Sequence, residues 1–372
     1  MPTVRLGIIG TGLATEKLHW PALRQMRDQF EIVAFANHTR PKAEAFAELA
    51  GLSMDNYHSD YTDLLARDNV DAVLICLPIP LLYPSTRAAL EAGKHVLCEK
   101  PTGANIEQGR EFLSLSSLFP KLKVLIGENH FYRDDFRFAR SLLDDGVLGR
   151  VHLVTMRAFS QAEPSLGSYS ATLWRQAPQY RGGFHLDGGV HHIAQMRFLV
   201  GDIQALQGLT HYANPTMGGP SDLVVNLHFV NNALGSYEAA YLAIPTPNEA
   251  NGMRLYGSDG IFAWRGTTLT LSRGDGTVEE HIFECDGGYY NQFLNFYEAI
   301  VYDEPIVSTI EQSFANLVVV MQALDSAESR SVVEVTEIPG GLSESPVPLW
   351  RPRRAKGLFD GLPTKHREGS KR

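Results

Sequence analysis

Apolar runs and helix-like segments alternate along the first third of the chain. Runs with the length of buried strands lie at residues 3–9, 31–37, 70–77, 95–98 and 123–127. Segments whose apolar residues recur at helical spacing separate them, at residues 18–26, 41–50, 85–92 and 106–118. This alternation is typical of a parallel sheet with helices on both faces. It predicts an α/β domain at residues 1–127, with the doubly wound parallel sheet of a Rossmann domain.

A different pattern follows residue 150. Strand-like segments lie at residues 151–160, 203–212, 222–231, 234–242, 253–257 and 278–285. Turn residues at 231–232 and 274–276 join some of these segments directly. Consecutive hairpins indicate an open, mostly antiparallel sheet. We therefore expect a C-terminal α+β domain at residues 128–345.

Composition narrows the class of protein. The 372 residues favour two domains, and the net charge of −9 argues against a nucleic-acid partner. No apolar run approaches the length of a membrane span, and the first residues do not resemble a signal peptide. The three cysteines are sparse, which favours reduced thiols. We expect a cytoplasmic protein without a membrane partner.

The last residues, 346–372, form a basic tail. From Trp350 onward, eight Lys or Arg residues face only Asp360 and Glu368. A nuclear address or an anion-binding arm would have this composition. The preferred interpretation is a solvated terminus that is partly packed through Leu358 and Phe359.

A glycine-rich turn follows the first predicted strand. Gly10-Thr11-Gly12-Leu13 would let backbone N–H groups approach a pyrophosphate at the start of a helix. The usual third small residue is replaced by Thr15, and an ordinary strand-to-helix turn is the alternative. The surrounding strand–helix–strand pattern favours dinucleotide binding.

The end of the second predicted strand bears on the choice of dinucleotide. An Asp or Glu there would bind the 2′-hydroxyl of NAD. The chain has Asn37-His38-Thr39-Arg40 instead, which offers a hydroxyl, an imidazole and a guanidinium. These groups suit a 2′-phosphate, so NADP is favoured over NAD.

Glu99-Lys100-Pro101 ends the fourth predicted strand, at the edge where doubly wound sheets bind ligands. A lysine beside the nicotinamide would orient a substrate hydroxyl or exchange a proton with it. The alternative is a surface lysine paired with Glu99.

A second polar cluster lies at residues 182–192. If these residues are helical, Asp187 and His191 share one face at i and i+4. Such a pair would form an oriented general base. A metal site of His185, Asp187, His191 and His192 is an alternative that we disfavour, and a purely structural Asp–His pair is another. We expect no metal.

Together these segments resemble the Gfo/Idh/MocA family, named for glucose–fructose oxidoreductase, inositol dehydrogenase and a rhizopine-catabolism protein. The resemblance covers about residues 4–335. It rests on the sequences at residues 7–12, 71–78, 92–101, 174–175, 182–183 and 187–193. The stretch 92–101 followed by Asp-x-x-x-His is its most specific part.

The resemblance implies a Rossmann domain, an α+β domain whose open sheet often forms homo-oligomer contacts, and reversible oxidation of a sugar or cyclitol hydroxyl. It implies that His191 exchanges the proton, that Lys100 positions the substrate, and that Asp187 orients His191 or the substrate. It also implies that several further residues line the cofactor site or its junction with the substrate: Leu77, Pro78, Asn129, Trp174 and Arg175.

Some positions differ from the family's common pattern. Leu82 and Ala194 stand where polar residues are frequent, and Ile79 replaces a frequent Asn. These changes favour a less polar hydroxyl or ketone over a polyhydroxylated substrate. We therefore expect an NAD(P)-dependent oxidoreductase acting on a small molecule. The alternatives are a redox-neutral enzyme with retained NAD and a non-catalytic dinucleotide-binding regulator.

Overall fold

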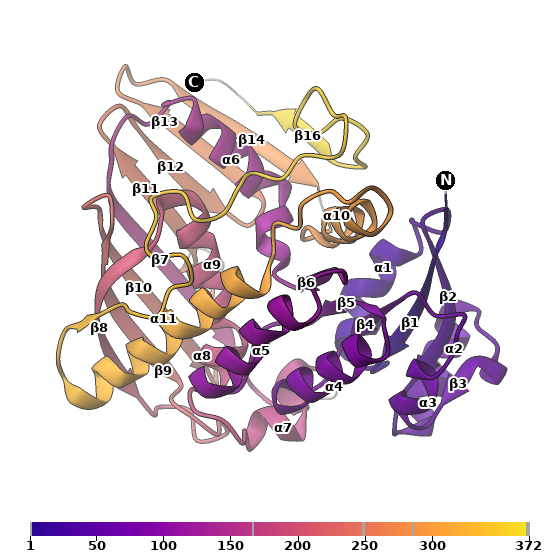
Figure 1. Ribbon diagram of the computed structural model, residues 1–372. Helices are drawn as coiled ribbons and strands as arrows, with labels where there is room; N and C mark the ends of the chain where they lie inside the picture. Colours follow the sequence, from indigo (N-terminus) through magenta and orange to yellow (C-terminus); the bar gives the residue numbers. More distant parts are fainter. Residues whose placement is uncertain (1, 166, 248–249, 285, 370–372) are drawn as a thin grey trace.

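In the computed structural model, two β-sheets lie beside each other and helices fill the space between them (Figure 1). The structure describes residues 2–165, 167–247, 250–284 and 286–369. The fold class expected from the sequence is confirmed: a parallel sheet in the N-terminal half and a mostly antiparallel sheet in the C-terminal half.

The N-terminal sheet has six parallel strands in the order β3-β2-β1-β4-β5-β6. The strands are β1 (Val4–Ile9), β2 (Phe30–Ala36), β3 (Tyr57–His58), β4 (Ala72–Ile75), β5 (His95–Cys98) and β6 (Val124–Ile126). The strand order reverses between β1 and β4, which is where such sheets bind ligands at their carboxyl edge. Only the two-residue strand β3 was missing from the predicted strands.

Four regular helices connect these strands: α2 (Arg40–Ala50), α3 (Tyr61–Leu65), α4 (Ile79–Glu91) and α5 (Ile106–Leu118). Helix α4 begins six residues before the predicted start. Pro80 lies in its first turn, where a missing N–H costs nothing, and the helix continues past Pro84. Helix α5 matches its predicted bounds because Asn105 caps it, accepting a hydrogen bond from the Gln108 N–H.

The first crossover is irregular. A π-helical turn (Thr15–His19) leads into the short helix α1 (Trp20–Leu23), with Pro21 in its first turn. The buried Thr15 hydroxyl donates to the Gly10 carbonyl at 2.6 Å. Thr15 therefore stabilises the glycine turn at the position where a small residue is usual.

The C-terminal sheet has ten strands in the order β15-β8-β9-β10-β7-β11-β12-β13-β14-β16. They are β7 (Val151–Gln161), β8 (Ile203–His211), β9 (Asp222–Phe229), β10 (Leu234–Leu242), β11 (Gly252–Gly257), β12 (Gly260–Arg265), β13 (Thr268–Arg273), β14 (Val278–Glu284), β15 (Val333–Glu334) and β16 (Lys365–Glu368). Neighbours are antiparallel except β7 and β10. The last predicted strand extended to Cys285, which lies outside the described residues.

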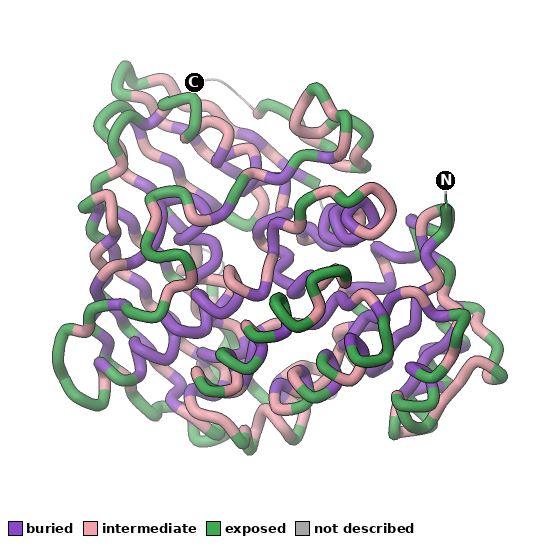
Figure 2. Tube along the Cα trace, in the orientation of Figure 1, coloured by how far each residue is buried: buried purple, intermediate pink, exposed green. Residues whose placement is uncertain are grey.

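Helices cover one face of this sheet and separate it from the Rossmann sheet (Figure 1). They are α6 (Asp134–Asp144), α9 (Gly189–Val200), α10 (Tyr289–Tyr302) and α11 (Ile310–Ser329). Helix α11 packs against β8, α9 and α5, so it joins the two halves. Figure 2 shows buried residues concentrated between the layers, with exposed residues at the outer turns and helix faces. In the described part of the chain, no helix is long and apolar enough to cross a membrane.

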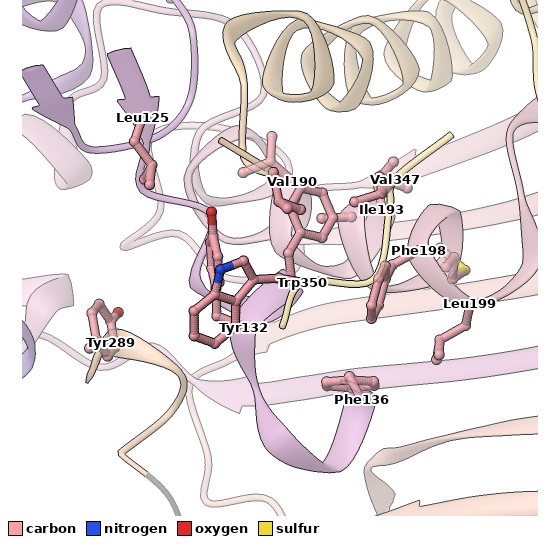
Figure 3. Packing of buried hydrophobic residues seen from close by; sticks show 14 of the residues in the cluster. Leu125, Tyr132, Phe136, Val190, Ile193, Phe198, Leu199, Tyr289, Val347 and Trp350 are labelled. Carbon is pink, nitrogen blue, oxygen red and sulfur yellow. The ribbon is translucent and has the colours of Figure 1, made fainter. Parts of the chain in front are cut away.

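The basic tail is packed more fully than the sequence suggested. Trp350 is buried against Tyr132, with ring centroids 5.8 Å apart (Figure 3). The buried Arg137 guanidinium donates to the carbonyls of Trp350 and Leu358. Strand β16 then pairs with β14. Phe359 is partly buried, as the expected partial packing requires, and the burial of Trp350 and the pairing of β16 extend that packing, while many residues between 351 and 368 are exposed.

Candidate functional site

A cavity of about 670 Å³ opens at the carboxyl edge of the Rossmann sheet. Its walls come from the ends of β1, β4 and β5 and from the segment between β7 and α8 (Phe184–Asp187). Most of the predicted cofactor residues line it: Gly10, Gly12, Leu13, His38, Leu77, Pro78, Glu99, Lys100, Trp174 and Arg175. The structure thus brings together residues that lie far apart in the sequence.

The glycine turn fits a pyrophosphate. Gly10 has φ +92°, and a Cβ there would lie 2.2 Å from the Cys76 carbonyl oxygen. A Cβ on Gly12 would meet nothing within 4 Å, so the backbone is open to a ligand on that side. The Thr11 hydroxyl is buried and has no hydrogen-bond partner among the residues that the structure describes. These residues would hold a dinucleotide in the manner that the sequence predicts.

The end of β2 differs in detail from the prediction. His38 lines the cavity and Lys42, which the sequence reasoning missed, lines it too. Thr39 and Arg40 are not among the lining residues; the exposed Arg40 guanidinium instead pairs with Glu44 at 2.8 Å. Lys42 lies in the first turn of α2, so its position relative to the strand end could have suggested a cation there.

Asp187 is held by two cations. Lys100 Nζ donates to Asp187 Oδ1 at 2.9 Å and to the Asp187 carbonyl at 2.6 Å, and Arg175 Nε donates to Oδ2 at 2.6 Å. Burial alone would raise the pKa of Asp187, but the charges of Lys100 and Arg175 outweigh it and hold the pKa well below its usual range. The Arg175 guanidinium also lies over the Trp174 ring, 4.0 Å from its centroid.

Lys100 is thus not a surface lysine paired with Glu99. The Glu99 carboxylate accepts from the buried His19 imidazole, with Nε2 to Oε1 at 2.7 Å. Burial alone would lower the pKa of His19, but the Cys76 thiol and the Glu99 carboxylate raise it to about 10. Glu99 therefore neutralises His19 and leaves Lys100 to Asp187.

The predicted Asp187–His191 pair is not formed. The helix is interrupted at Gly188, so Asp187 at the end of α8 and His191 in α9 belong to separate helices. A Cβ on Gly188 would lie 2.7 Å from the Tyr241 hydroxyl, so close packing against β10 accompanies the break. His191 Nδ1 lies 2.8 Å from both carboxylate oxygens of Glu128 instead.

Glu128 is a second site residue, besides Lys42, that sequence reasoning missed. It follows β6, and its side chain is 1% exposed. Its Oε1 also accepts from the His130 N–H and lies 3.1 Å from His130 Nδ1. Its position just after β6, at the carboxyl edge of the Rossmann sheet, could have suggested a role in the site. No pattern in the sequence between Glu128 and His191 predicted their contact.

Glu128 and His130 both have shifted pKa values. Burial alone would raise the pKa of Glu128, but the His191 and His130 imidazoles hold it well below its usual range. Burial lowers the pKa of His130 to about 4. At neutral pH the cluster is therefore a carboxylate with a neutral His130 beside it.

The remaining candidates lie around this cluster. Asn129 is buried and donates to the Gly287 carbonyl at 2.7 Å, but it does not line the cavity. His192 Nδ1 lies 2.8 Å from the Tyr237 hydroxyl, and His185 is buried against the Tyr241 ring. In the described residues, Glu128, His130 and His191 form the set of three histidine or carboxylate groups whose ligand atoms all lie within 4.8 Å of one another, and hydrogen bonds already connect them. The disfavoured metal set of His185, Asp187, His191 and His192 is thus not brought together.

A second cavity, of about 630 Å³, adjoins His130 of this cluster. His130 and His192 form part of its wall, opposite residues of β7, β10, β11 and β12. Its lining includes the aromatic Tyr241 and Trp264 and the arginines Arg133, Arg157 and Arg265. The His130 and His191 rings meet edge to face, with centroids 4.6 Å apart.

The sequence matches a known family in both halves. Residues 4–118 match the oxidoreductase family with an NAD-binding Rossmann fold, and residues 136–263 match the GFO/IDH/MocA C-terminal domain. The chain belongs to the Gfo/Idh/MocA family. It is an oxidoreductase with an NAD-binding Rossmann domain.

Relatives and solved structures agree with this membership. The chain is 27% identical over 322 residues to an uncharacterized protein of Saccharomyces cerevisiae, covering 81% of this chain and 88% of that one. It is 29% identical over 200 residues to the inositol 2-dehydrogenase of Rhizobium meliloti, covering 54% and 56% of the two chains. An oxidoreductase structure from Thermotoga maritima superposes with a TM-score of 0.82 at 30% identity, covering 90% and 99%. The WlbA dehydrogenase of Bordetella pertussis, solved with NADH and UDP-GlcNAcA, has the same fold, with a TM-score of 0.78 at 18% identity over 90% and 98%.

Proposed function

We propose that this protein transfers a hydride between a nicotinamide cofactor, NADP in preference to NAD, and a secondary alcohol, hemiacetal or ketone of a sugar, polyol or related small molecule. The observation that carries the proposal is the position of Lys100, which lines the cofactor cavity while its amine is tied to Asp187. A named inositol 2-dehydrogenase and a named D-glucoside 3-dehydrogenase among the relatives support the substrate class.

Lys100 and His191 divide the work at the substrate oxygen in this proposal. The Lys100 ammonium donates to the oxygen and polarises it, while Asp187 and Arg175 keep the amine in place. His191 exchanges the hydroxyl proton. When bound, the nicotinamide supplies the acceptor or donor of the hydride. In the oxidation, the O–H proton goes to His191, the C–H bond gives up its electron pair as hydride, and a C=O bond forms.

The preference for NADP rests on the end of β2. Asn37, His38 and Lys42 line the cavity there, and the Asn37 amide stands where a carboxylate would bind the 2′-hydroxyl of NAD. An imidazole and an ammonium suit a 2′-phosphate.

The substrate is proposed to enter from the second cavity. His130 and His192 belong to its wall, and the second sheet supplies aromatic, hydroxyl and guanidinium groups. The prediction of a less polar hydroxyl or ketone rests on Leu82 and Ala194 alone, because this lining also carries cationic groups.

The second sheet is proposed to form homo-oligomer contacts through its uncovered face. Leu153, Leu209, Val224 and Leu234 are exposed on the neighbouring strands β7, β8, β9 and β10. Exposed apolar side chains on a sheet face are typical of subunit interfaces.

A cytoplasmic location and the lack of a nucleic-acid partner also stay predictions.

A fluorescence titration of the purified protein with NADPH and NADH tests the proposal, followed by a screen of cyclitols, glucosides, polyols and ketones. Tight binding of NADPH by an initially empty protein, with turnover of a screened compound, is the expected result. A nicotinamide that co-purifies and does not exchange would favour redox-neutral chemistry, and no binding of either nucleotide would contradict the proposal.

A further inference from the structure

Glu128, which follows β6 and comes from outside the Asp-x-x-x-His segment, is the sole carboxylate hydrogen-bonded to His191 within the described residues. The Asp187 carboxylate oxygens accept hydrogen bonds from Lys100 and Arg175 instead. We propose that Glu128 is the positioning residue of the acid–base histidine, holding its Nδ1–H and leaving Nε2 free for the substrate proton. This inference rests on the proposed function.

The tautomer follows from hydrogen-bonding capacity. An ionised carboxylate only accepts hydrogen bonds, so His191 Nδ1 must carry the hydrogen that lies between it and Glu128. A neutral imidazole with Nδ1–H has its lone pair on Nε2. Glu128 therefore selects the form of His191 that takes a proton from a hydroxyl at Nε2.

Glu128 is itself fixed. Its Oε1 accepts from the His130 N–H at 3.1 Å, and His130 Nδ1 lies at the same distance. The carboxylate is almost fully buried, so it does not rotate toward water. His130 thus acts as a clamp, and the pair resembles in logic the carboxylate that orients the histidine of a hydrolase triad.

The charge of Glu128 has a second consequence. When Nε2 takes the substrate proton, the imidazolium forms in contact with the carboxylate and is stabilised by it. The other titratable groups around His191 are Glu99 from the end of β5, His130 next to Glu128, and His192 from the same helix, with Arg133 behind His130. Of these, Glu128 alone hydrogen-bonds the ring within the described residues.

The test uses nitrogen NMR on full-length protein with labelled histidine, so it needs no substrate. His191→Asn assigns the signal. We expect His191 in the unaltered protein to show a protonated Nδ1 and an unprotonated Nε2 at high pH. In Glu128→Gln the amide keeps the hydrogen bond but loses the charge, so the titration midpoint of His191 should move down by about one pH unit.

Two variants control for general damage to the site. Glu128→Asp keeps the charge and should move the midpoint by much less. Asp187→Asn removes the carboxylate that Lys100 and Arg175 hold and should leave the tautomer of His191 unchanged. If Glu128→Gln does not fold, the tautomer of the unaltered protein still decides the matter.

An Nε2–H tautomer in the unaltered protein would overturn the inference, as would equal midpoints in the unaltered protein and Glu128→Gln. With an active substrate, Glu128→Gln should also lower kcat by about 10²-fold and shift the pH–rate profile for oxidation toward lower pH. An inactive protein with the Nδ1–H tautomer would contradict the proposed reaction while leaving the positioning role of Glu128 in place.

Discussion

Two buried carboxylates at the site are paired in different ways. Asp187 binds Lys100 and Arg175, whereas Glu128 binds His191 and His130. Both have a pKa held below its usual range. Lysine and arginine keep their charge at any pH near neutrality, whereas an imidazole can bind and release a proton.

The difference separates a fixed network from a responsive one. Asp187 with its two cations is a permanent arrangement that positions Lys100. Glu128 with its two imidazoles changes in energy whenever His191 gains or loses a proton. The carboxylate nearest in sequence to His191 thus belongs to the lysine, and the one that serves the histidine comes from another part of the chain.

Removing the amine from the fixed network should have the largest effect. Lys100→Ala should lower kcat by about 10²-fold or more, because a positioned donor at the substrate oxygen is lost, while cofactor affinity changes little. Steady-state kinetics and fluorescence titration measure the two quantities. Lys123→Ala, which removes a lysine paired with Asp303 outside the cavity, should keep full turnover. Unchanged turnover in Lys100→Ala would contradict the assignment.

Removing the anion from the same network should destabilise the fold. Asp187→Asn leaves the largely buried Lys100 and Arg175 without a counter-charge, which should lower the free energy of unfolding by about 2 kcal/mol. Urea unfolding at neutral pH checks this. Glu44→Gln breaks an exposed pair with Arg40 and should cost less than about 0.5 kcal/mol. Equal losses in the two variants would mean that Asp187 is no better paired than a surface residue.

The buried histidines should make the free energy of unfolding fall as the pH is lowered. Burial lowers the pKa of His130 and His185 to about 4 and that of His192 to about 3, whereas unfolded histidines titrate near 6.5. Below pH 6.5 the unfolded state binds more protons, so each imidazole should cost up to about 1.4 kcal/mol per pH unit until its folded pKa is reached. Urea unfolding at several pH values measures the slope.

A variant of an exposed histidine provides the control. His152→Gln should keep this slope, whereas His130→Gln should make it shallower. His19, with its pKa raised to about 10, contributes stability that is fully present below pH 6.5 and is lost as the pH rises toward 10, so it does not affect the acid range. Stability that stays constant from pH 7 to 5 would contradict neutral buried imidazoles.

The smallest effect concerns the cofactor's 2′-phosphate. Lys42→Ala should weaken NADPH binding by about 10-fold and leave NADH binding nearly unchanged, because it removes one charge from the cavity wall. Arg40→Ala serves as the matched control and should change neither affinity by more than about twofold. Fluorescence titration with both nucleotides gives the answer, and equal losses for NADPH and NADH would show that Lys42 does not contact the phosphate.

Local signals made much of the fold predictable. Strand β5 and helix α5 have their predicted bounds, because a buried apolar run defines the first and the Asn105 cap starts the second. Strand β3 was missed because two residues are too few to show the alternation of apolar and polar side chains that predicts a strand. Strands β12 and β13 were missed although Leu269 and Leu271 alternate with polar residues in β13, and pairing with β11 and β14 extends the sheet there.

The site was predictable where a single strand edge supplies it. Gly10, Lys100 and Pro78 follow strands of one parallel sheet, so their meeting at one edge follows from topology. The Glu128–His191 contact depends on how α9 packs against the segment after β6, and on the break at Gly188. Helical periodicity alone predicted a pair of His191 with Asp187, whereas His191 contacts Glu128.

The most direct test of the central claim is whether reduced nicotinamide accumulates in step with an oxidised product. The purified protein is mixed with NADP⁺ and each screened cyclitol, glucoside or polyol, and the absorbance of the reduced cofactor is compared with the amount of ketone formed. We predict one reduced cofactor for each ketone. A product that forms from the substrate with no net reduction of the cofactor would contradict the account.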